Sequence, residues 1–303
     1  MYDIVIIGGG PGGLTAGIYA GRARLKTIVV DKGLYGGQMQ NTLEVENYPG
    51  WKTITGPQLA EQMYEHMLEF GTEWKQAEVI GVDFTGRVKT LELSDGSTLQ
   101  ARVVIIATGA QPRTLNVPGE KEFAGRGVSY CATCDGAFFR NREVVVVGGG
   151  DSAVEEGVFL TRFASQVTIV HRRDQFRAQP ILQERAFANP KIKVVWDTVV
   201  EAIAGDSRVS KVVVRNVRTG LVSELKADGV FIYVGYLPNT EFLRDTGLLN
   251  AAGYIETDAK MSTKIPGVFA AGDVRDTALR QIVTAAGDGA LAAMSAYHYL
   301  ESW

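Results

Sequence analysis

Apolar residues in this chain gather in short runs of strand length, and glycine-rich turns separate these runs from helix-like segments. The first run covers residues 4–7 and is followed by the glycine-rich residues 8–13. A helix-like segment extends from there to Arg24, and a second apolar run covers residues 27–30. This order predicts strand, turn, helix and strand, the unit from which α/β folds are built.

The same pattern occurs a second time in the middle of the chain. Residues 143–147 are predicted to form a strand, residues 148–153 are again rich in glycine, a helix-like run extends to Ala164, and residues 167–170 form the next strand. The spacing is also the same. From Gly8 to Asp31 there are 31 − 8 = 23 positions, and from Gly148 to His171 there are 171 − 148 = 23 positions. His171 therefore corresponds to Asp31.

Both turns carry a dinucleotide-binding fingerprint. The first is G-x-G-x-x-G and the second is G-x-G-x-x-A. One glycine makes the turn, one lets the backbone approach a pyrophosphate, and the third position lets the helix pack on the strand, while the helix N-terminus offers free N–H groups. The residues predicted to line these turns are Gly8, Gly10, Pro11 and Gly13 in the first copy, and Gly148, Gly150, Asp151, Ser152 and Ala153 in the second.

The residues that end the second strand of each copy differ. Asp31 offers a carboxylate to the 2′-hydroxyl of a ribose. The second copy has His171, Arg172, Arg173 and Arg177 instead, and guanidinium groups suit a 2′-phosphate by charge and geometry. The sequence therefore favours NADPH over NADH for this copy. A basic turn that only faces solvent is the alternative.

The remaining elements indicate two domains. We expect a helix at 57–70, strands within 73–106 with a turn at Asp95-Gly96, and a strand-rich stretch at 193–233. Proline residues near position 115 suggest a linker, and residues 237–239 suggest a return crossing. The prediction is an α/β fold of two Rossmann-like three-layer domains, with the second domain, residues 116–242, inserted into the first.

Composition narrows the function classes. The chain has 303 residues, of which 46% are hydrophobic and 21% charged, as expected for a globular protein. The net charge of -3 gives no support for nucleic-acid binding. No apolar run approaches the ~20 residues that cross a bilayer, and the first residues do not resemble a leader peptide. We therefore expect a cytoplasmic protein without a membrane partner.

The chain has two cysteines, Cys131 and Cys134, in one C-x-x-C motif. A zinc site needs about four ligands, and the three histidines are scattered, so we expect no metal. A structural disulfide across so short a loop would contribute only about 2 kcal/mol. Two inert buried thiols are possible, but reversible disulfide chemistry suits the motif best. Asp135 follows directly, as a proton carrier, a helix-capping carboxylate, or both.

Taken together, these motifs resemble the small bacterial thioredoxin reductases over essentially the whole chain. Besides the two fingerprints, the basic segment and the cysteine motif through Asp135, the matching segments are Gly36-Gly37-Gln38, Glu46-Asn47-Tyr48-Pro49-Gly50, Ala107-Thr108-Gly109, Ala271-Gly272-Asp273 and Arg280-Gln281-Ile282. One departure is Asp31, where relatives more often carry glutamate. The resemblance also implies that residues 243–303, a strand, a turn and an alanine-rich helix from about Gln281, rejoin residues 1–115 as a discontinuous first domain.

The resemblance implies FAD in the first domain, NADPH in the second, a homodimer, and thioredoxin as a separate protein substrate. Asp273 would hold the ribityl chain of FAD, and Arg280, Gln281 and Ile282 would lie at the flavin ring. Cys134 would face the flavin, Cys131 would attack the substrate disulfide, and Asp135 would act as acid and base. The further residues implied for FAD are Gly37, Gln38, Asn47, Ala107, Thr108, Gly109 and Gly272.

Three alternatives to this function stay open at the level of sequence. The acceptor could be another disulfide protein, such as a peroxiredoxin-system or glutaredoxin-like carrier. The electrons could instead go to ferredoxin or oxygen with silent cysteines. A nucleotide sensor without catalysis is the third alternative.

Overall fold

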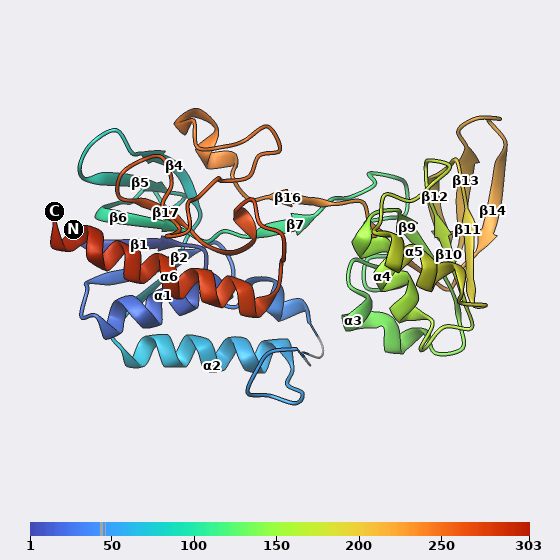
Figure 1. Ribbon diagram of the computed structural model, residues 1–303, viewed down its shortest axis with the longest axis horizontal. Coiled ribbons are helices and arrows are strands. Elements are labelled where there is room, and N and C mark those ends of the chain that lie inside the picture. The colour runs from blue at the N-terminus through green and yellow to red at the C-terminus, as the bar shows by residue number, and fades with distance from the viewer. Residues whose placement is uncertain (43–44, 46) are drawn as a thin grey trace. The chain divides into compact units, whose positions relative to one another are not determined.

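The computed structural model describes residues 1–42, 45 and 47–303. The chain divides into two compact units: unit 1 is Met1–Gln111 with Leu237–Trp303, and unit 2 is Pro112–Tyr236. The chain passes between the units twice, through strands β7 (Ala110–Pro112) and β16 (Tyr236–Pro238), which pair with each other (Figure 1). These crossings lie a few residues before the boundaries expected from the sequence.

Unit 1 contains a seven-stranded sheet, in which six strands follow the order β3-β2-β1-β6-β5-β4 and the seventh, β17, pairs with β6. The strands β1, β2, β3, β6 and β17 are parallel, and β4 and β5 continue the sheet antiparallel. The tail of the chain therefore joins the N-terminal sheet. The strands are β1 Tyr2–Ile7, β2 Thr27–Asp31, β3 Glu73–Gln76, β4 Val79–Asp83, β5 Lys89–Leu93, β6 Thr98–Ile106 and β17 Val268–Ala270.

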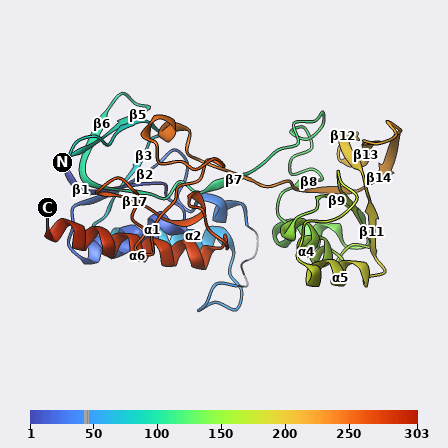
Figure 2. The same cartoon turned by 45° about the horizontal axis from the view of Figure 1, so that its top comes forward.

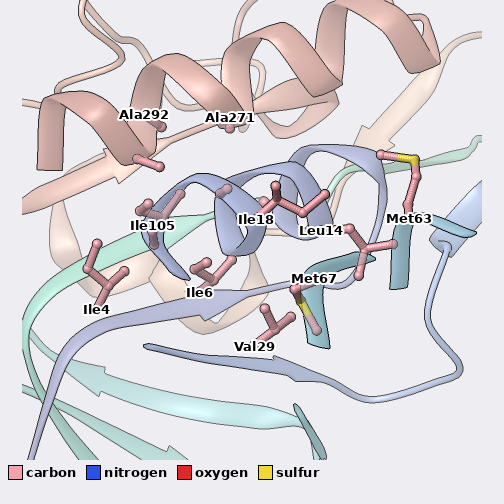
Figure 3. Close-up of a cluster of buried hydrophobic side chains, with 14 of the residues drawn as sticks. Ile4, Ile6, Leu14, Ile18, Val29, Met63, Met67, Ile105, Ala271 and Ala292 are labelled. Carbon is pink, nitrogen blue, oxygen red and sulfur yellow. The ribbon is translucent and has the colours of Figure 1, made fainter. Parts of the chain in front are cut away.

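Alternation along β1 gives the sheet of unit 1 two apolar faces. Ile4 and Ile6 belong to a core cluster with helices α1 (Pro11–Arg22), α2 (Gly56–Glu69) and α6 (Ile282–Glu301). Figure 3 shows this cluster, in which Leu14 and Ile18 of α1 pack between the sheet and α6. Val5 and Ile7 point to the opposite face and pack in a second cluster. Both faces of the parallel strands are covered, as this class of sheet requires.

Unit 2 repeats the parallel arrangement in a five-stranded sheet of order β11-β10-β9-β15-β8. Helices α4 (Asp151–Leu160) and α5 (Pro180–Phe187) cover one face, and an antiparallel sheet of order β12-β13-β14 packs on the other (Figure 2). The strands are β8 Val128–Ser129, β9 Glu143–Gly148, β10 Gln166–Val170, β11 Ile192–Val195, β12 Thr198–Gly205, β13 Val209–Asn216, β14 Val222–Lys226 and β15 Gly229–Tyr233.

Both units have the α/β architecture that the sequence pattern predicts, and two helices end earlier than expected. Helix α1 ends at Arg22 because Arg24 is in the left-handed region, with φ of 59°. Helix α4 ends at Leu160, and residues 161–163 form a turn. Short helices complete the fold: α3 Ala132–Asp135, η1 Gly37–Asn41, η2 Gly136–Phe139, η3 Glu241–Thr246 and η4 Gly272–Val274.

Candidate active site

The first glycine turn leaves no room for side chains where strand and helix meet. A Cβ atom on Gly8 would lie 2.4 Å from the carbonyl oxygen of Ala107, and one on Gly13 would lie 1.8 Å from that of Gly8. Gly10, in contrast, faces open space, with no atom within 4 Å of its Cβ position. Helix α1 begins at Pro11 without a side-chain cap, so its first N–H groups are free to bind an anion.

The second glycine turn has the same construction. A Cβ atom on Gly148 would lie 2.3 Å from the carbonyl oxygen of Tyr233, and Gly150 again faces open space. Helix α4 begins at Asp151 with no side-chain cap from Gly150. The Asp151 carboxylate accepts hydrogen bonds from the backbone N–H and the side-chain amide of Gln179, at 2.7 and 3.1 Å. The turn is thereby tied to the segment that follows the arginines.

Asp31 and His171 occupy matching places beside the two turns. The Asp31 carboxylate accepts hydrogen bonds from the N–H groups of Gly9 and Gly33, at 2.6 and 2.7 Å. In unit 2 a Cβ atom on Gly149 would lie 2.2 Å from Nδ1 of His171, so the imidazole packs directly on that glycine. Burial, together with nearby arginines, lowers the pKa of His171. A neutral ring therefore stands where unit 1 has a carboxylate.

The arginines beside His171 are exposed and available to a ligand. Arg172, Arg173 and Arg177 all face solvent. The nearby carboxylates of Asp174 and Asp197 both pair with Arg218 instead. Among the described residues, no carboxylate forms an ion pair with the three arginines. Their charges are thus available to a phosphate group.

In unit 1 the fold brings together most of the residues that the resemblance implies for FAD. A Cβ atom on Gly37 would lie 3.2 Å from the Cα atom of Gly10, so η1 closes over the first glycine turn. The Asn47 side chain donates a hydrogen bond to the Gln281 side chain at 2.9 Å. Gln38 is exposed. Glu46, part of a matching segment, lies outside the described residues.

A second group of these residues surrounds the end of β6. Buried Ala107 donates its N–H to Ile7. The Thr108 hydroxyl donates to the Asn239 carbonyl at 2.7 Å, and the Asn239 side chain donates to the Thr108 carbonyl at 2.8 Å. The Asn239 N–H binds the carbonyl of Gly109. Asn239 therefore fixes the Ala107-Thr108-Gly109 segment.

Asp273 is a partly buried carboxyl group in η4. Burial raises its pKa to about 6, an effect that Arg280 opposes and Asp288 reinforces. No described residue donates a hydrogen bond to this carboxyl group, so a polyhydroxyl chain is a suitable partner for it. Gly272, with φ of 73°, donates its N–H to Asp288 at 3.0 Å, and Asp288 also pairs with Arg275.

Helix α6 begins next to this group. Gln281 is its N-cap and forms a reciprocal capping box with Thr284, so Ile282 is the first helical residue. The guanidinium of Arg280 lies 4.8 Å from the ring centroid of Tyr254, and its Nε atom is buried without a hydrogen-bond partner among the described residues.

Cys131 and Cys134 form a disulfide bond, with 5.3 Å between their Cα atoms. Cys131 is the N-cap of α3, and its Sγ accepts a hydrogen bond from the N–H of Cys134 at 3.2 Å. The Thr133 hydroxyl lies 3.3 Å from the same sulfur. Cys134 is buried, whereas Cys131 is partly exposed. Asp135 makes no side-chain capping hydrogen bond at the start of η2, so its predicted role as a capping carboxylate is wrong.

A cavity of about 280 Å³ lies beside the cysteine segment. Asp135, Phe138 and Phe139 line it together with Arg126 and Arg208. Phe138 is 69% exposed, so its ring is accessible at this cavity. The structure thus places a cavity with two aromatic rings, two arginines and two carboxylates, Asp135 and Asp228, beside the residue that follows the disulfide.

Sequence reasoning missed several residues of this region. Glu156 and Tyr233 lie beside the cysteine helix, and Arg275 and Asp288 hold the turn that carries Asp273. Two of them leave a trace in the sequence. Glu156 precedes Leu160 by one helical turn, and Asp288 precedes Ala292 in the same way, so each places a carboxylate next to the buried stripe of its helix.

Other site types find no support in the part of the chain that the structure describes. Its cysteines, histidines and carboxylates do not gather in any group of three or more that could hold a metal ion. Within the same residues, no helix has both the length and the apolar character needed to span a membrane.

Known proteins resemble the chain over its whole length. It is 53% identical to a thioredoxin reductase of Bacillus subtilis over 302 residues, which covers 99% of this chain and 95% of that protein. Among solved structures, thioredoxin reductase from Lactococcus lactis matches with a TM-score of 0.83 and 51% identity over 100% of both chains. The enzyme from Streptococcus pyogenes matches with a TM-score of 0.82 and 53% identity, covering 100% of this chain and 99% of that one.

The family model for pyridine nucleotide-disulphide oxidoreductases matches residues 2–289. This match includes both glycine turns, the arginine segment and the cysteine pair. The two-domain Rossmann-like fold predicted from the sequence is thereby confirmed. With two nucleotide turns and a disulfide in one chain, the protein belongs to the pyridine nucleotide-disulphide oxidoreductase family.

Proposed function

We propose that this oxidoreductase is a thioredoxin-disulfide reductase that uses NADPH, FAD and the Cys131–Cys134 disulfide. The observation that carries the proposal is the disulfide itself, with one buried and one accessible sulfur beside an aromatic surface. Relatives named thioredoxin reductase, about half identical over the full chain, support the same acceptor.

The two units would hold different cofactors. In unit 1 the free N-terminus of α1, the carboxylate of Asp31 and the unpartnered carboxyl of Asp273 fit the phosphates, ribose and ribityl chain of FAD. In unit 2 the free N-terminus of α4 and the exposed arginines fit NADPH with its 2′-phosphate. When bound, these cofactors would supply the electron pair that reduces the disulfide.

The protein's own sulfur chemistry then follows from the geometry. After reduction, the N–H of Cys134 and the hydroxyl of Thr133 stabilise a thiolate on Cys131, the more accessible sulfur. This thiolate attacks the substrate disulfide, forms a mixed disulfide and releases one substrate thiolate. The Cys134 thiolate then attacks the Cys131 sulfur, which releases the second substrate thiolate and restores the internal disulfide. Asp135, free of capping contacts, would carry a proton in these steps.

A protein substrate fits the surroundings of Cys131. The exposed ring of Phe138 and the cavity that Asp135 shares with Arg126 and Arg208 offer an aromatic and polar contact surface close to the cysteine segment. Buried aromatic and arginine contacts are the common anchors of protein interfaces. We also propose a homodimer in the cytoplasm, on the family resemblance. Light scattering of the purified protein would test the dimer.

Trapping the mixed disulfide tests the function directly. Cys134→Ser leaves Cys131 as a free thiol, so this variant should form a covalent adduct with oxidised thioredoxin that reductant dissolves. Cys131→Ser should form far less adduct, because Cys134 is buried. Both variants should keep their flavin and still pass electrons from NADPH to ferricyanide.

The outcomes separate the alternatives. Turnover of thioredoxin by Cys131→Ser at the wild-type rate would contradict the proposed function and favour silent cysteines. Faster turnover with a glutaredoxin-like or peroxiredoxin-system protein than with thioredoxin would keep the chemistry and change the acceptor. A colourless protein that takes up no flavin would contradict the whole electron route.

A further inference from the structure

Glu156 is a half-buried carboxyl group that the proposed chemistry does not use. It lies on α4 one turn before Leu160, and a Cβ atom on Gly136, directly after the cysteine helix, would lie 3.1 Å from the Leu160 side chain. Residues four apart share a helix face, so Glu156 faces the cysteine segment as well. Its Oε2 atom is enclosed without a hydrogen-bond partner among the described residues.

Tyr233, the last residue of β15, connects this region to the cysteines. Its phenol oxygen accepts a hydrogen bond of 2.6 Å from the N–H of Ala132, the residue that follows Cys131. Burial raises the pKa of Tyr233 well above its ordinary value, and the carboxyl groups of Glu156 and Asp135 raise it further. Tyr233 therefore stays protonated, within the electrostatic reach of both carboxyl groups.

We propose that Glu156, acting through Tyr233 and the cysteine helix α3, is a positioning residue that couples proton uptake to the opening of the Cys131–Cys134 disulfide. The inference rests on the proposed function only in taking this disulfide as the one that turns over. The reductant, which is dithiothreitol in the test below and would be the bound cofactors in the proposed reaction, supplies two electrons, the S–S bond breaks, and the sulfurs become one thiol, protonated from solvent, and one thiolate. One further proton binds Glu156 whenever that group is ionised beforehand.

The coupling follows from like charges in one partly buried region. Burial and the neighbouring Glu155 raise the pKa of Glu156 to about 7, so the group changes charge near neutral pH. A thiolate formed at the cysteines raises the proton affinity of Glu156 further. By reciprocity, an ionised Glu156 makes the disulfide harder to reduce. Tyr233 accepts the N–H of Ala132, the first residue of α3, and also lies within the electrostatic reach of Glu156.

The other charged groups near α4 do not offer the same coupling. Asp151, at the start of α4, is engaged with Gln179. Glu184 and Arg185 on α5 are exposed, and Glu143, at the start of β9, pairs with Lys226. Glu155 is exposed on α4, Asp135 lies on α3, and Tyr236 further raises the pKa of Tyr233. Glu156 alone among these carboxylates combines an enclosed, unpartnered oxygen with this location.

The test measures the ratio of dithiol to disulfide in the flavin-loaded protein, equilibrated with reduced and oxidised dithiothreitol between pH 6 and 9. Acid quenching, alkylation and mass spectrometry count the two forms without using flavin colour or turnover. The measured ratios are corrected for the titration of dithiothreitol. As pH rises from 6 to 9, the ratio of dithiol to disulfide should fall about tenfold more in the wild type than in Glu156→Gln, because coupling between two sites typically has this size. The pH dependence of this ratio in Tyr233→Phe should lie between that of the wild type and that of Glu156→Gln.

Two further variants make the result decisive. Glu156→Asp keeps a carboxyl group and should restore part of the wild-type pH dependence, whereas a merely structural role would not depend on charge. Glu184→Gln, an exposed change on α5, should match the wild type. Identical pH dependence in Glu156→Gln and the wild type would overturn the proposal. Because dithiothreitol supplies the electrons, this outcome is independent of whether NADPH and thioredoxin are the true partners.

Discussion

The two nucleotide-binding turns of this protein share one backbone design and differ in what surrounds it. Positions correspond at a constant offset, since 148 − 8 = 140 and 171 − 31 = 140. In both, the first glycine has a positive φ and packs against the carbonyl of a neighbouring strand, and the second fingerprint glycine faces open space. Neither helix has a side-chain cap. The backbone thus provides a place for a pyrophosphate twice, whatever the rest of the ligand is.

The two turns differ at positions that would face the rest of a bound nucleotide or that lie near the disulfide. Asp31 becomes His171 at the end of the second strand, and Ala16, fully buried in α1, becomes Glu156 in α4. The first change puts an imidazole in place of a carboxylate, next to three exposed arginines. The second places a carboxyl group next to the cysteine helix. The two turns thus share a backbone and differ in a few side chains, each of which can be exchanged.

The largest effect is expected from exchanging the third fingerprint position. Gly13→Ala gives unit 1 the residue that unit 2 has at Ala153, but its Cβ atom would lie 1.8 Å from the backbone oxygen of Gly8. The backbone must move to make room for this atom, which costs about 4 kcal/mol. We expect this cost to weaken FAD binding roughly a thousandfold. Flavin absorbance per protein measures this. Ala153→Gly is the control and should retain FAD. Full flavin content in Gly13→Ala would contradict the prediction, because it would show that the first turn accommodates a Cβ atom at this position as the second turn does at Ala153.

The arginines should produce the next largest effect. Replacing Arg172, Arg173 and Arg177 with glutamine removes the charges available to a 2′-phosphate. The ratio of kcat/KM for NADPH to that for NADH should fall by ~100-fold, equivalent to one or two charged hydrogen bonds. Arg218→Gln, which removes the partner of Asp174 and Asp197, is the matched control. An unchanged ratio in the triple variant would identify these residues as a solvated surface turn.

The exchange of Ala16 for Glu156 predicts a pH-dependent stability. The pKa of Glu156 rises from 4.5 to about 7 on folding, so between these values the folded state holds a proton that the unfolded state has lost. Stability therefore falls as pH rises from about 4.5 to 7. Glu156→Gln removes this loss. At pH 8 its free energy of unfolding should exceed that of the wild type by about 2 kcal/mol, a value reduced to allow for the partial exposure of the group. Thermal unfolding at pH 5 and pH 8 measures it, with Glu184→Gln as control. A variant no more stable than the wild type at pH 8 would contradict the prediction.

The smallest effect is expected at Asp31. Both carboxylate oxygens already accept backbone N–H groups, so Asp31→Asn replaces one acceptor with a donor. We expect FAD binding to weaken by about fivefold, since one hydrogen bond costs roughly 1 kcal/mol. Fluorescence titration of the apoprotein with FAD measures this. No change in affinity would assign Asp31 to the support of the turn alone.

The sequence shows the repeated design clearly because local signals specify it. Glycine spacing, strand-length apolar runs and the arginine segment are all read within about 30 residues. The contacts that complete the site join distant segments instead. Asn239 fixes Thr108 and Tyr233 holds Ala132, and no local pattern announces either contact. Asp135 illustrates the same limit, since only the structure shows that its side chain makes no capping hydrogen bond.

The central claim is that electrons from NADPH reach the Cys131–Cys134 disulfide, and counting electrons tests it most directly. The flavin-loaded protein is titrated anaerobically with NADPH, and free thiols are then alkylated and counted. The wild type should take up one electron pair more than Cys134→Ser and gain two alkylated cysteines. If oxidised thioredoxin is added before alkylation, both cysteines should form the disulfide again and escape alkylation. Equal NADPH uptake by the two proteins, with the disulfide still intact, would contradict the account.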